Sequence, residues 1–421
     1  MLIQCPYASD DNLQPDPCAD YLFLKEEPPI RKDEDLGVWL VTGFEEVGAL
    51  LRHPALSSAW PERGKTVLHS TAARAGGTAR TSDTVRRWFM FNDGARHRRL
   101  RQLMAPLFGT DQLAQLRPFI EEQVDELVDA RRDRVDVMSD LAVPLSSRVI
   151  CRLLGVPADV APHLEGWAQD IAALLVADYL PEVAERGHRA LEQVEDVVRR
   201  SAESTTLPEE SGLALLFRAG CAGVIEDADM AAIASLIIYA GFETTSTFIG
   251  KAVRSALHAN AWCELAGADA ESSVEELLRF DTSVRQVARV ATAAVDLSGQ
   301  RIEAGDLVLL MLGAANRDPR EFTTPDGLDL RRKGRRHLGF GYGSHYCLGA
   351  GLARLEVQIL LRKLAARWQT AELVAQPTIR YHYGITVLEQ LEIKVHSPHE
   401  SAHDLRAGSH SLQASRPSGL L

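Results

Sequence analysis

The chain has 421 residues, of which 46% are hydrophobic and 25% are charged, as in a soluble globular protein with a large core. Its formal net charge of −12 argues against a general nucleic-acid binder, because affinity for phosphates needs a surplus of lysine and arginine. The six cysteines show no C-x-x-C spacing, which indicates reduced intracellular thiols rather than a disulfide framework or a zinc site.

The beginning of the chain has no basic segment followed by an apolar run, which argues against a secretory signal. The best candidate for a membrane span, residues 231–241, has about half the length that a span needs. We therefore expect a cytoplasmic protein without a membrane anchor.

The first hundred residues alternate between irregular and regular patterns. Residues 1–35 are rich in proline and aspartate, so we expect an irregular lead-in. The apolar run 38–41 predicts a strand, and Thr42 with Glu45 predicts a capping box for the following helix. Residues 56–86 are polar and rich in arginine, which predicts a long loop of the kind that covers binding sites.

A basic helix is predicted after the turn at residues 92–94. His97 and Arg101 lie four residues apart and share one face of it. Runs of charge are usually solvated, so the other arginines of this helix are expected to point outward. Apolar spacing predicts further helices over residues 113–128, 141–154, 163–178 and 181–204. The apolar run 307–310 predicts a short buried strand.

A long helix, predicted over residues 227–260, contains the unusual segment 240–245, with the sequence Ala-Gly-Phe-Glu-Thr-Thr. Glycine weakens a helix, and glutamate and threonine are costly beside apolar neighbours unless they are paired or used. Threonine hydroxyls can also bond back to the preceding turn and bend the axis. The segment indicates either a bent structural helix or a functional site at Glu243 and Thr244.

The glycine-rich stretch 340–349 contains Cys347 and precedes an apolar-faced helix that begins near Ala350. Free N–H groups and the positive dipole at a helix N-terminus lower the pKa of a thiol, so we expect Cys347 to form a thiolate readily. A thiolate is a strong iron ligand. A lone cysteine would otherwise be interpreted as a small buried hydrophobic residue.

The pattern Phe340-x-x-Gly343-x-His345-x-Cys347-x-Gly349 resembles the haem-binding loop of the cytochrome P450 family. Four more of the family's motifs occur here in the family's order: an H-x-x-x-R pair (His97, Arg101), an acid–alcohol motif (Glu243, Thr244), an E-x-x-R pair (Glu276, Arg279) and an A-N-R-D-P turn (residues 315–319).

The resemblance covers residues 38–395. It implies a mainly α fold with small β-sheets, in a single large domain over residues 36–396 that holds haem b. Residues 397–421 are expected to be a disordered tail.

The resemblance also implies roles for individual residues. Glu243 and Thr244 would organise water and deliver protons during catalysis. Glu276 and Arg279 would form a buried structural cluster with Arg332. The cofactor-binding residues would be the iron ligand Cys347, its loop neighbours Phe340, His345 and Gly349, and the propionate-binding residues His97, Arg101 and Arg289.

One departure from the family lies at Thr282-Ser283, where members often have a Pro-Pro step. It leaves the course of the backbone over residues 284–288 open.

The implied activity is that of a haem-thiolate monooxygenase that hydroxylates, epoxidises or couples a small organic molecule, as in bacterial secondary metabolism and antibiotic biosynthesis. Electrons would come from NAD(P)H through a ferredoxin reductase and a ferredoxin docked on the basic helix. A peroxide-driven peroxygenase and a non-turnover partner protein are the alternatives. Arg63, Arg74 and Arg80 favour an acidic or carrier-tethered substrate over a plain hydrocarbon.

Overall fold

The computed structural model of the chain describes residues 28–59, 83–131, 133–177, 180–202, 207–334, 336–382 and 384–396. The predicted disordered tail (397–421) lies outside these residues, as do Arg63, Arg74 and Arg80. Within them the protein is mainly helical with small β-sheets, as predicted.

Two stretches that were expected to be irregular contain regular structure. The end of the lead-in forms strand β1 (Ile30–Asp33), antiparallel to β2 (Val38–Val41), so the prediction of an irregular lead-in is wrong there. The expected loop over residues 56–86 begins with strand β3 (Leu56–Ser57) and ends with helix α5 (Asp83–Arg86). The two short strands depend on pairing with other strands, which their own residue pattern does not reveal.

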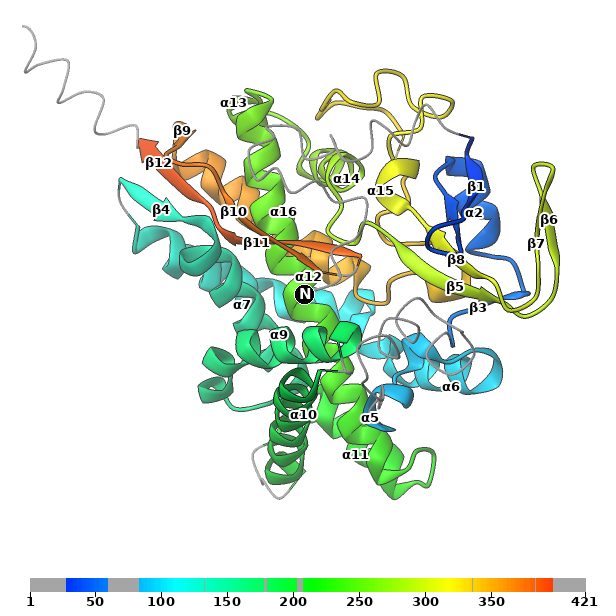
Figure 1. Ribbon diagram of the computed structural model, residues 1–421. Coiled ribbons are helices and arrows are strands. Elements are labelled where there is room, and N and C mark those ends of the chain that lie inside the picture. Colours follow the sequence, from blue (N-terminus) through cyan, green and yellow to red (C-terminus); the bar gives the residue numbers. More distant parts are fainter. Residues whose placement is uncertain are drawn as a thin grey trace, which may run out of the picture.

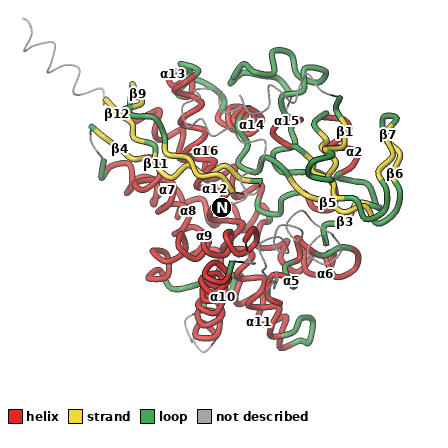
Figure 2. Tube along the Cα trace, viewed as in Figure 1, coloured by secondary structure: helices red, strands yellow, loops and turns green. Residues whose placement is uncertain are grey.

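Most of the long helices gather at the left and bottom of the view and the largest sheet lies at the right, while the strands near the C-terminus run along the helical side (Figure 1). Figure 2 shows the same division by colour. The helices, besides α5, are α2 (Phe44–Leu50), α6 (Gly94–Met104), α7 (Thr110–Asp129), α8 (Val143–Leu154), α9 (Ala161–Ala177), α10 (Pro181–Ala202), α11 (Gly212–Cys221), α12 (Asp227–His258), α13 (Trp262–Leu265), α14 (Ala270–Phe280), α15 (Leu312–Ala315) and α16 (Ala350–Arg367).

Helix α12 runs through the middle of the molecule and contacts α8, α9, α10, α14 and α16 (Figure 1). Gly241 lets α8 pack closely, because a Cβ there would lie 2.5 Å from Cδ1 of Ile150. The helix is long and apolar enough to cross a membrane, which corrects the estimate made from residues 231–241. However, 78% of its most apolar window is buried inside the protein, as in a core helix of a soluble protein.

The largest sheet has the strand order β1-β2-β8-β5-β3, in which only the β2–β8 pair is parallel. The strands predicted over residues 38–41 and 307–310 are confirmed as β2 and β8. The remaining strands are β4 (Arg134–Asp136), β5 (Val287–Ala291), β6 (Val295–Leu297), β7 (Gln300–Ile302), β8 (Leu307–Leu310), β9 (Thr370–Leu373), β10 (Thr378–His382), β11 (Ile385–Gln390) and β12 (Glu392–His396).

The N-terminus of α2 is capped from a distant part of the chain. Gly43 occupies the cap position without a side-chain bond, so the predicted capping box is wrong. Instead, the N–H of Phe44 donates to Oδ2 of Asp318 at 2.8 Å. Arg320 then links the carboxylates of Asp318 and Glu46. The turn over residues 315–319 thereby holds α2 against the large sheet.

The helices share one large buried cluster of apolar side chains, and the large sheet forms a second one with α2. Side chains from both clusters line a cavity between them. Leu236 of α12 contributes from the first cluster, and Leu51 and Leu312 contribute from the second. The fold therefore places the cavity at the junction of its helical and sheet parts.

Candidate functional site

The cavity has a volume of about 390 Å³ and lies between α12, α6, β5 and the loop that carries Cys347. All of the predicted site residues line it, although they come from four separate segments of the chain. They are His97, Arg101, Glu243, Thr244, Arg289, Phe340, His345, Cys347 and Gly349. Most of the remaining wall is apolar, with contributions from Phe89, Met90, Ile150, Leu175, Leu236, Ile237, Phe248, Val284, Val287 and Ile385.

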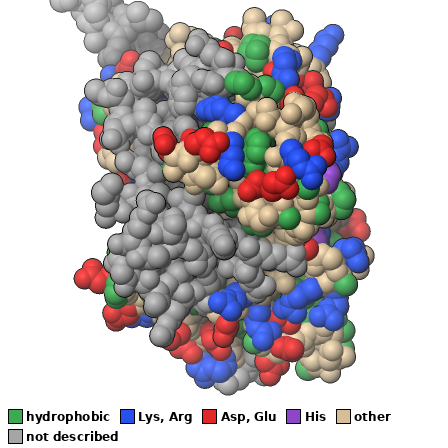
Figure 3. Space-filling model, turned by 45° about the vertical axis from the view of Figure 1, so that its right-hand side comes forward, with side chains coloured by type: hydrophobic (Ala, Val, Ile, Leu, Met, Phe, Trp, Pro, Cys, Tyr) green, Lys and Arg blue, Asp and Glu red, His purple; other side chains and the backbone are tan. Residues whose placement is uncertain are grey.

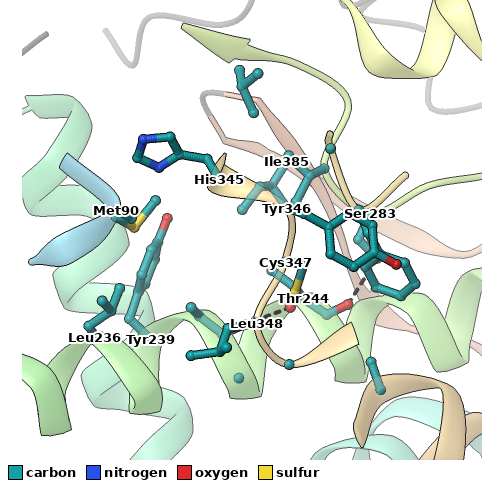
Figure 4. A pocket seen from close by; sticks show the side chains of 18 of the residues that line it. Met90, Leu236, Tyr239, Thr244, Ser283, His345, Tyr346, Cys347, Leu348 and Ile385 are labelled. Atoms are coloured by element: carbon teal, nitrogen blue, oxygen red, sulfur yellow. Dashed lines mark hydrogen bonds between the residues drawn. The ribbon is translucent and has the colours of Figure 1, made fainter. Parts of the chain in front are cut away.

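The sulfur of Cys347 opens into this cavity, just before the first turn of α16 (Figure 4). The N–H of Cys347 donates to the carbonyl of Phe340 at 2.9 Å, which closes the loop. Burial raises the pKa of the thiol, so the prediction of a lowered pKa is wrong for the chain without iron. A hydrogen bond from the N–H of Gly349 and the charges of Arg101 and Arg354 oppose this rise.

The cysteine loop is braced from behind by Arg354. Its guanidinium donates to both carboxylate oxygens of Glu275 and to the hydroxyl of Tyr346, and it lies 4.5 Å from the centre of the Phe340 ring. His337 also contacts Glu275, at 3.1 Å. Burial alone would raise the pKa of Glu275, but the bonds from His337 and Arg354 lower it to about 2. The brace is therefore charged and fully hydrogen-bonded.

A second buried cluster confirms the predicted grouping of Glu276, Arg279 and Arg332. Arg279 donates to Glu276 through Nε and Nη2, at 2.7 and 2.8 Å. Arg332 donates to the same carboxylate at 2.9 Å. Arg279 also donates to the carbonyls of residues 316, 325 and 327, so the cluster fastens α14 to the segment that leads into the cysteine loop.

Two histidines and two arginines gather at one end of the cavity. His97 and His345 stack with their ring centres 4.0 Å apart. Burial, and then the charges of His345 and Arg101, lower the pKa of His97 to about 4. Arg101 donates to the carbonyl of Tyr346 at 2.6 Å, while buried Arg289 donates to the carbonyl of the preceding residue in its own strand.

The two arginines and the imidazole of His97 fit a cofactor that carries carboxylates. Within the described part of the chain, no carboxylate forms an ion pair with Arg101 or Arg289, and Nε2 of His97 is buried without a hydrogen-bond partner. Uncompensated buried charges are costly. A flat group with two carboxylates and a metal that binds a thiolate, such as haem b, would satisfy both these residues and Cys347.

The opposite wall of the cavity is the segment of α12 predicted to be functional. It remains helical, and the hydroxyl of Thr244 donates to the carbonyl of Ala240 at 2.7 Å, so the predicted back-bond is confirmed. Glu243 is 3% exposed, and neither of its carboxylate oxygens has a hydrogen-bond partner among the described residues. Burial raises its pKa to about 7, although Arg380, 3.8 Å away, lowers it.

Comparisons with known proteins agree with this geometry. The Cytochrome P450 family model matches residues 270–395. The 20-oxo-5-O-mycaminosyltylactone 23-monooxygenase of Streptomyces fradiae is 31% identical over 375 residues, which cover 86% of this chain and 83% of that enzyme. The chain belongs to the cytochrome P450 family.

Two solved P450 structures are similar over almost the whole chain. CalO2 has a TM-score of 0.82 and 29% identity, over 93% of this chain and 98% of CalO2. P450BioI, in complex with hexadec-9Z-enoic acid ligated acyl carrier protein, has a TM-score of 0.80 and 30% identity, over 90% of this chain and 98% of P450BioI. This P450 is therefore a haem-dependent monooxygenase of the bacterial type that receives electrons from redox partners.

Sequence reasoning missed three residues that contact the functional segment of the P450 helix. Ser283 donates to the carbonyl of Thr244 at 2.9 Å (Figure 4), which gives the departure at residues 282–283 a structural meaning. Arg380 reaches Glu243 from β10, through a fold that no local pattern indicates. Tyr239, one turn before Glu243, lines the cavity. It was missed because it follows an apolar run, a pattern typical of the core.

Strands β10 and β11 form an antiparallel hairpin on either side of residue 383, which lies outside the described residues. Gly384 at its tip has φ +77°, and its carbonyl accepts from the N–H of Arg285 at 2.6 Å. Because Ile385 lines the cavity, the hairpin contributes to the substrate side of the site.

The basic face of α6 is narrower than predicted. Arg98 and Arg99 are exposed, but Arg96 is half-buried and pairs with Asp229 at 2.6 Å. Figure 3 shows basic and acidic side chains interspersed over the described part of one face. A redox partner would therefore meet a few exposed arginines rather than a broad basic patch.

Proposed function

We propose that this P450 inserts one oxygen atom of dioxygen into a largely apolar small molecule of bacterial secondary metabolism, and that Cys347 and Glu243 with Thr244 carry the chemistry. We assign this activity to the domain expected over residues 36–396. The observation that carries the proposal is that the cysteine sulfur and the acid–alcohol pair line the same cavity, on its opposite walls.

Haem, when bound, supplies the reductive activation of dioxygen. Cys347 would hold the iron as a thiolate, stabilised by the N–H of Gly349 and by the positive charges of Arg101 and Arg354. His97, Arg101 and Arg289 would bind the haem carboxylates, since none of them forms an ion pair with a carboxylate of the described residues. Phe340, His345 and Gly349 would shape the loop against the cofactor.

Glu243 and Thr244 would move protons to the reacting oxygen. A carboxyl group whose pKa lies near 7 can both hold and release a proton at neutral pH. The Thr244 hydroxyl donates its hydrogen bond to the carbonyl of Ala240, so its free lone pairs can accept a hydrogen bond from water in the cavity. The pair can therefore organise water at this wall, with Glu243 as the proton source.

The walls favour an apolar substrate body, because aliphatic and aromatic side chains dominate them. P450BioI binds its fatty acyl chain on an acyl carrier protein, which supports a carrier-tethered substrate as one option here. The arginines at positions 63, 74 and 80 would then meet an acidic carrier. We further propose NAD(P)H as the electron source, a ferredoxin and its reductase as the redox partners, and a cytoplasmic location.

The decisive experiment replaces the cysteine. Cys347→Ser should abolish the red-shifted Soret band that a thiolate-bound haem gives in its reduced, CO-bound state, together with product formation. Cys221→Ser changes an exposed thiol and should leave both unchanged. An unchanged spectrum in Cys347→Ser would overturn the assignment. Product formed only with hydrogen peroxide, and not with NAD(P)H and redox partners, would make the protein a peroxygenase.

A further inference from the structure

The phenol of Tyr239 is an unpartnered polar group in an otherwise apolar part of the cavity. Its ring rises from α12, and its hydroxyl end lies beside Met90 (Figure 4). Both residues line the cavity together with Leu236 and Ile237. The hydroxyl makes no hydrogen bond with any described residue, although the ring is stacked and the side chain is half-buried.

The position of the phenol is fixed by Trp88. The two rings stack with centres 5.2 Å apart and planes at 23°. Trp88 is fully buried, and its Nε1 donates to Oγ of Ser235 at 3.0 Å; this hydroxyl in turn donates to the carbonyl of Ala232. Ser235, which binds Trp88, and Tyr239, which stacks on it, thus lie one turn apart on the same helix, and Trp88 connects them.

A fixed and unpartnered donor is a preorganised recognition group. The hydroxyl faces the cavity without a partner among the described residues, and a ligand that supplies an acceptor there gains a directed hydrogen bond. The ring is already held in place, so little rotamer entropy is lost when a ligand binds. Burial, and then the charge of Glu243, raise the pKa of Tyr239, so it remains a neutral donor over the working pH range.

We propose that Tyr239 is a specificity-determining residue that donates a hydrogen bond to a neutral oxygen acceptor of the substrate, such as a carbonyl, ether or hydroxyl. A carboxylate is disfavoured at this point because Glu243 lies one turn away on the same helix. The substrate is therefore an already oxygenated metabolite rather than a plain hydrocarbon. The inference rests on the proposed haem-dependent function.

The test uses phenylimidazoles, whose imidazole nitrogen binds haem iron and whose phenyl ring extends into the cavity. Three matched pairs carry either an acetyl or an isopropyl group at the ortho, meta or para position, so that the two groups differ in a hydrogen-bond acceptor at nearly constant size. Dissociation constants come from the shift of the Soret band, without turnover. The proteins are the wild-type holoenzyme, Tyr239→Phe, which retains the ring stack, and Ser235→Ala, which retains the phenol but releases Trp88.

We expect wild type to bind at least one acetyl compound about 3- to 10-fold more tightly than its isopropyl partner, the range that one net hydrogen bond allows. Tyr239→Phe should remove this preference without weakening the isopropyl compounds, and Ser235→Ala should reduce it. Equal preferences in wild type and Tyr239→Phe, or no preference in wild type, would overturn the inference.

A loss of haem from Tyr239→Phe would assign the hydroxyl to the cofactor instead. If no protein shows an imidazole-induced shift, the proposed haem function itself fails.

Discussion

The two walls of the cavity differ in how fully their polar side chains are hydrogen-bonded. Behind the cysteine loop, Glu275 and Glu276 are surrounded by donors from His337 and three arginines. On the α12 wall, neither carboxylate oxygen of Glu243 has a hydrogen-bond partner among the described residues, and the hydroxyl of Tyr239 makes no hydrogen bond with any of them. A saturated network fixes one geometry, whereas an unsatisfied group is left for a ligand, a water or a proton.

The comparison separates residues that hold the site in place from residues that are available to bind a ligand or transfer a proton. The brace behind the loop contains more charges than the α12 wall, yet none of its side chains needs a ligand to be satisfied. Arg101 and Arg289, which have no carboxylate partner among the described residues, and His97, whose Nε2 has no hydrogen-bond partner there, all face the cavity. Substitutions behind the loop should therefore reduce stability and cofactor retention, and those on α12 should reduce turnover while the fold persists.

The largest effect is expected from breaking the buried cluster with Glu276→Gln. The change leaves Arg279 and Arg332 facing each other without a carboxylate, at a site that is almost fully buried. Removing one partner of a buried pair costs about 3–5 kcal/mol of unfolding free energy. Urea unfolding and haem content measure this loss. The matched control is Glu303→Gln in an exposed pair with Arg301, which should leave the unfolding free energy almost unchanged because solvent screens the pair.

Thr244→Ala should separate function from stability on the other wall. The lost hydroxyl bonds only to a carbonyl of its own helix, and alanine has the higher helix propensity, so the unfolding free energy should change by less than about 1 kcal/mol. Loss of ordered proton delivery should lower product formed per electron consumed by about tenfold or more. Thr244→Ser keeps a hydroxyl and should retain most coupling. Full coupling in Thr244→Ala would refute the role of the hydroxyl.

Arg380→Gln should shift the pH dependence of this wall. Burial raises the pKa of Glu243 to about 7, Arg380 lowers it and Glu165 of α9 raises it. Without Arg380 the pKa rises further, so Glu243 keeps its proton to higher pH, and the alkaline limb of the coupling profile should move upward. Glu389→Gln should have the opposite effect, because Glu389 binds Arg380 at 2.6 Å and would release it toward Glu243. Identical profiles would exclude the contact.

How much of this could be predicted from the sequence depends on the distance over which each contact acts. Periodicity and fixed motif spacing were enough for α12, β2, β8 and the residues around Cys347. The cap of α2 on Asp318 and the approach of Arg380 to Glu243 could not be predicted, since each joins segments more than a hundred residues apart. The pKa of Cys347 was predicted wrongly because local rules see the helix dipole but not the burial that outweighs it.

The smallest effect is expected at Ser283, which lies in the segment after α14 and donates a hydrogen bond to α12. Its hydroxyl ties the segment after α14 to the carbonyl of Thr244 (Figure 4). Ser283→Ala removes a single neutral hydrogen bond, which contributes about 0.5–1.5 kcal/mol. Because Thr244 keeps its own hydroxyl, coupling should fall less than in Thr244→Ala, and Ser283→Thr should restore it. If Ser283→Ala matches wild type in both unfolding free energy and coupling, the bond does not position Thr244.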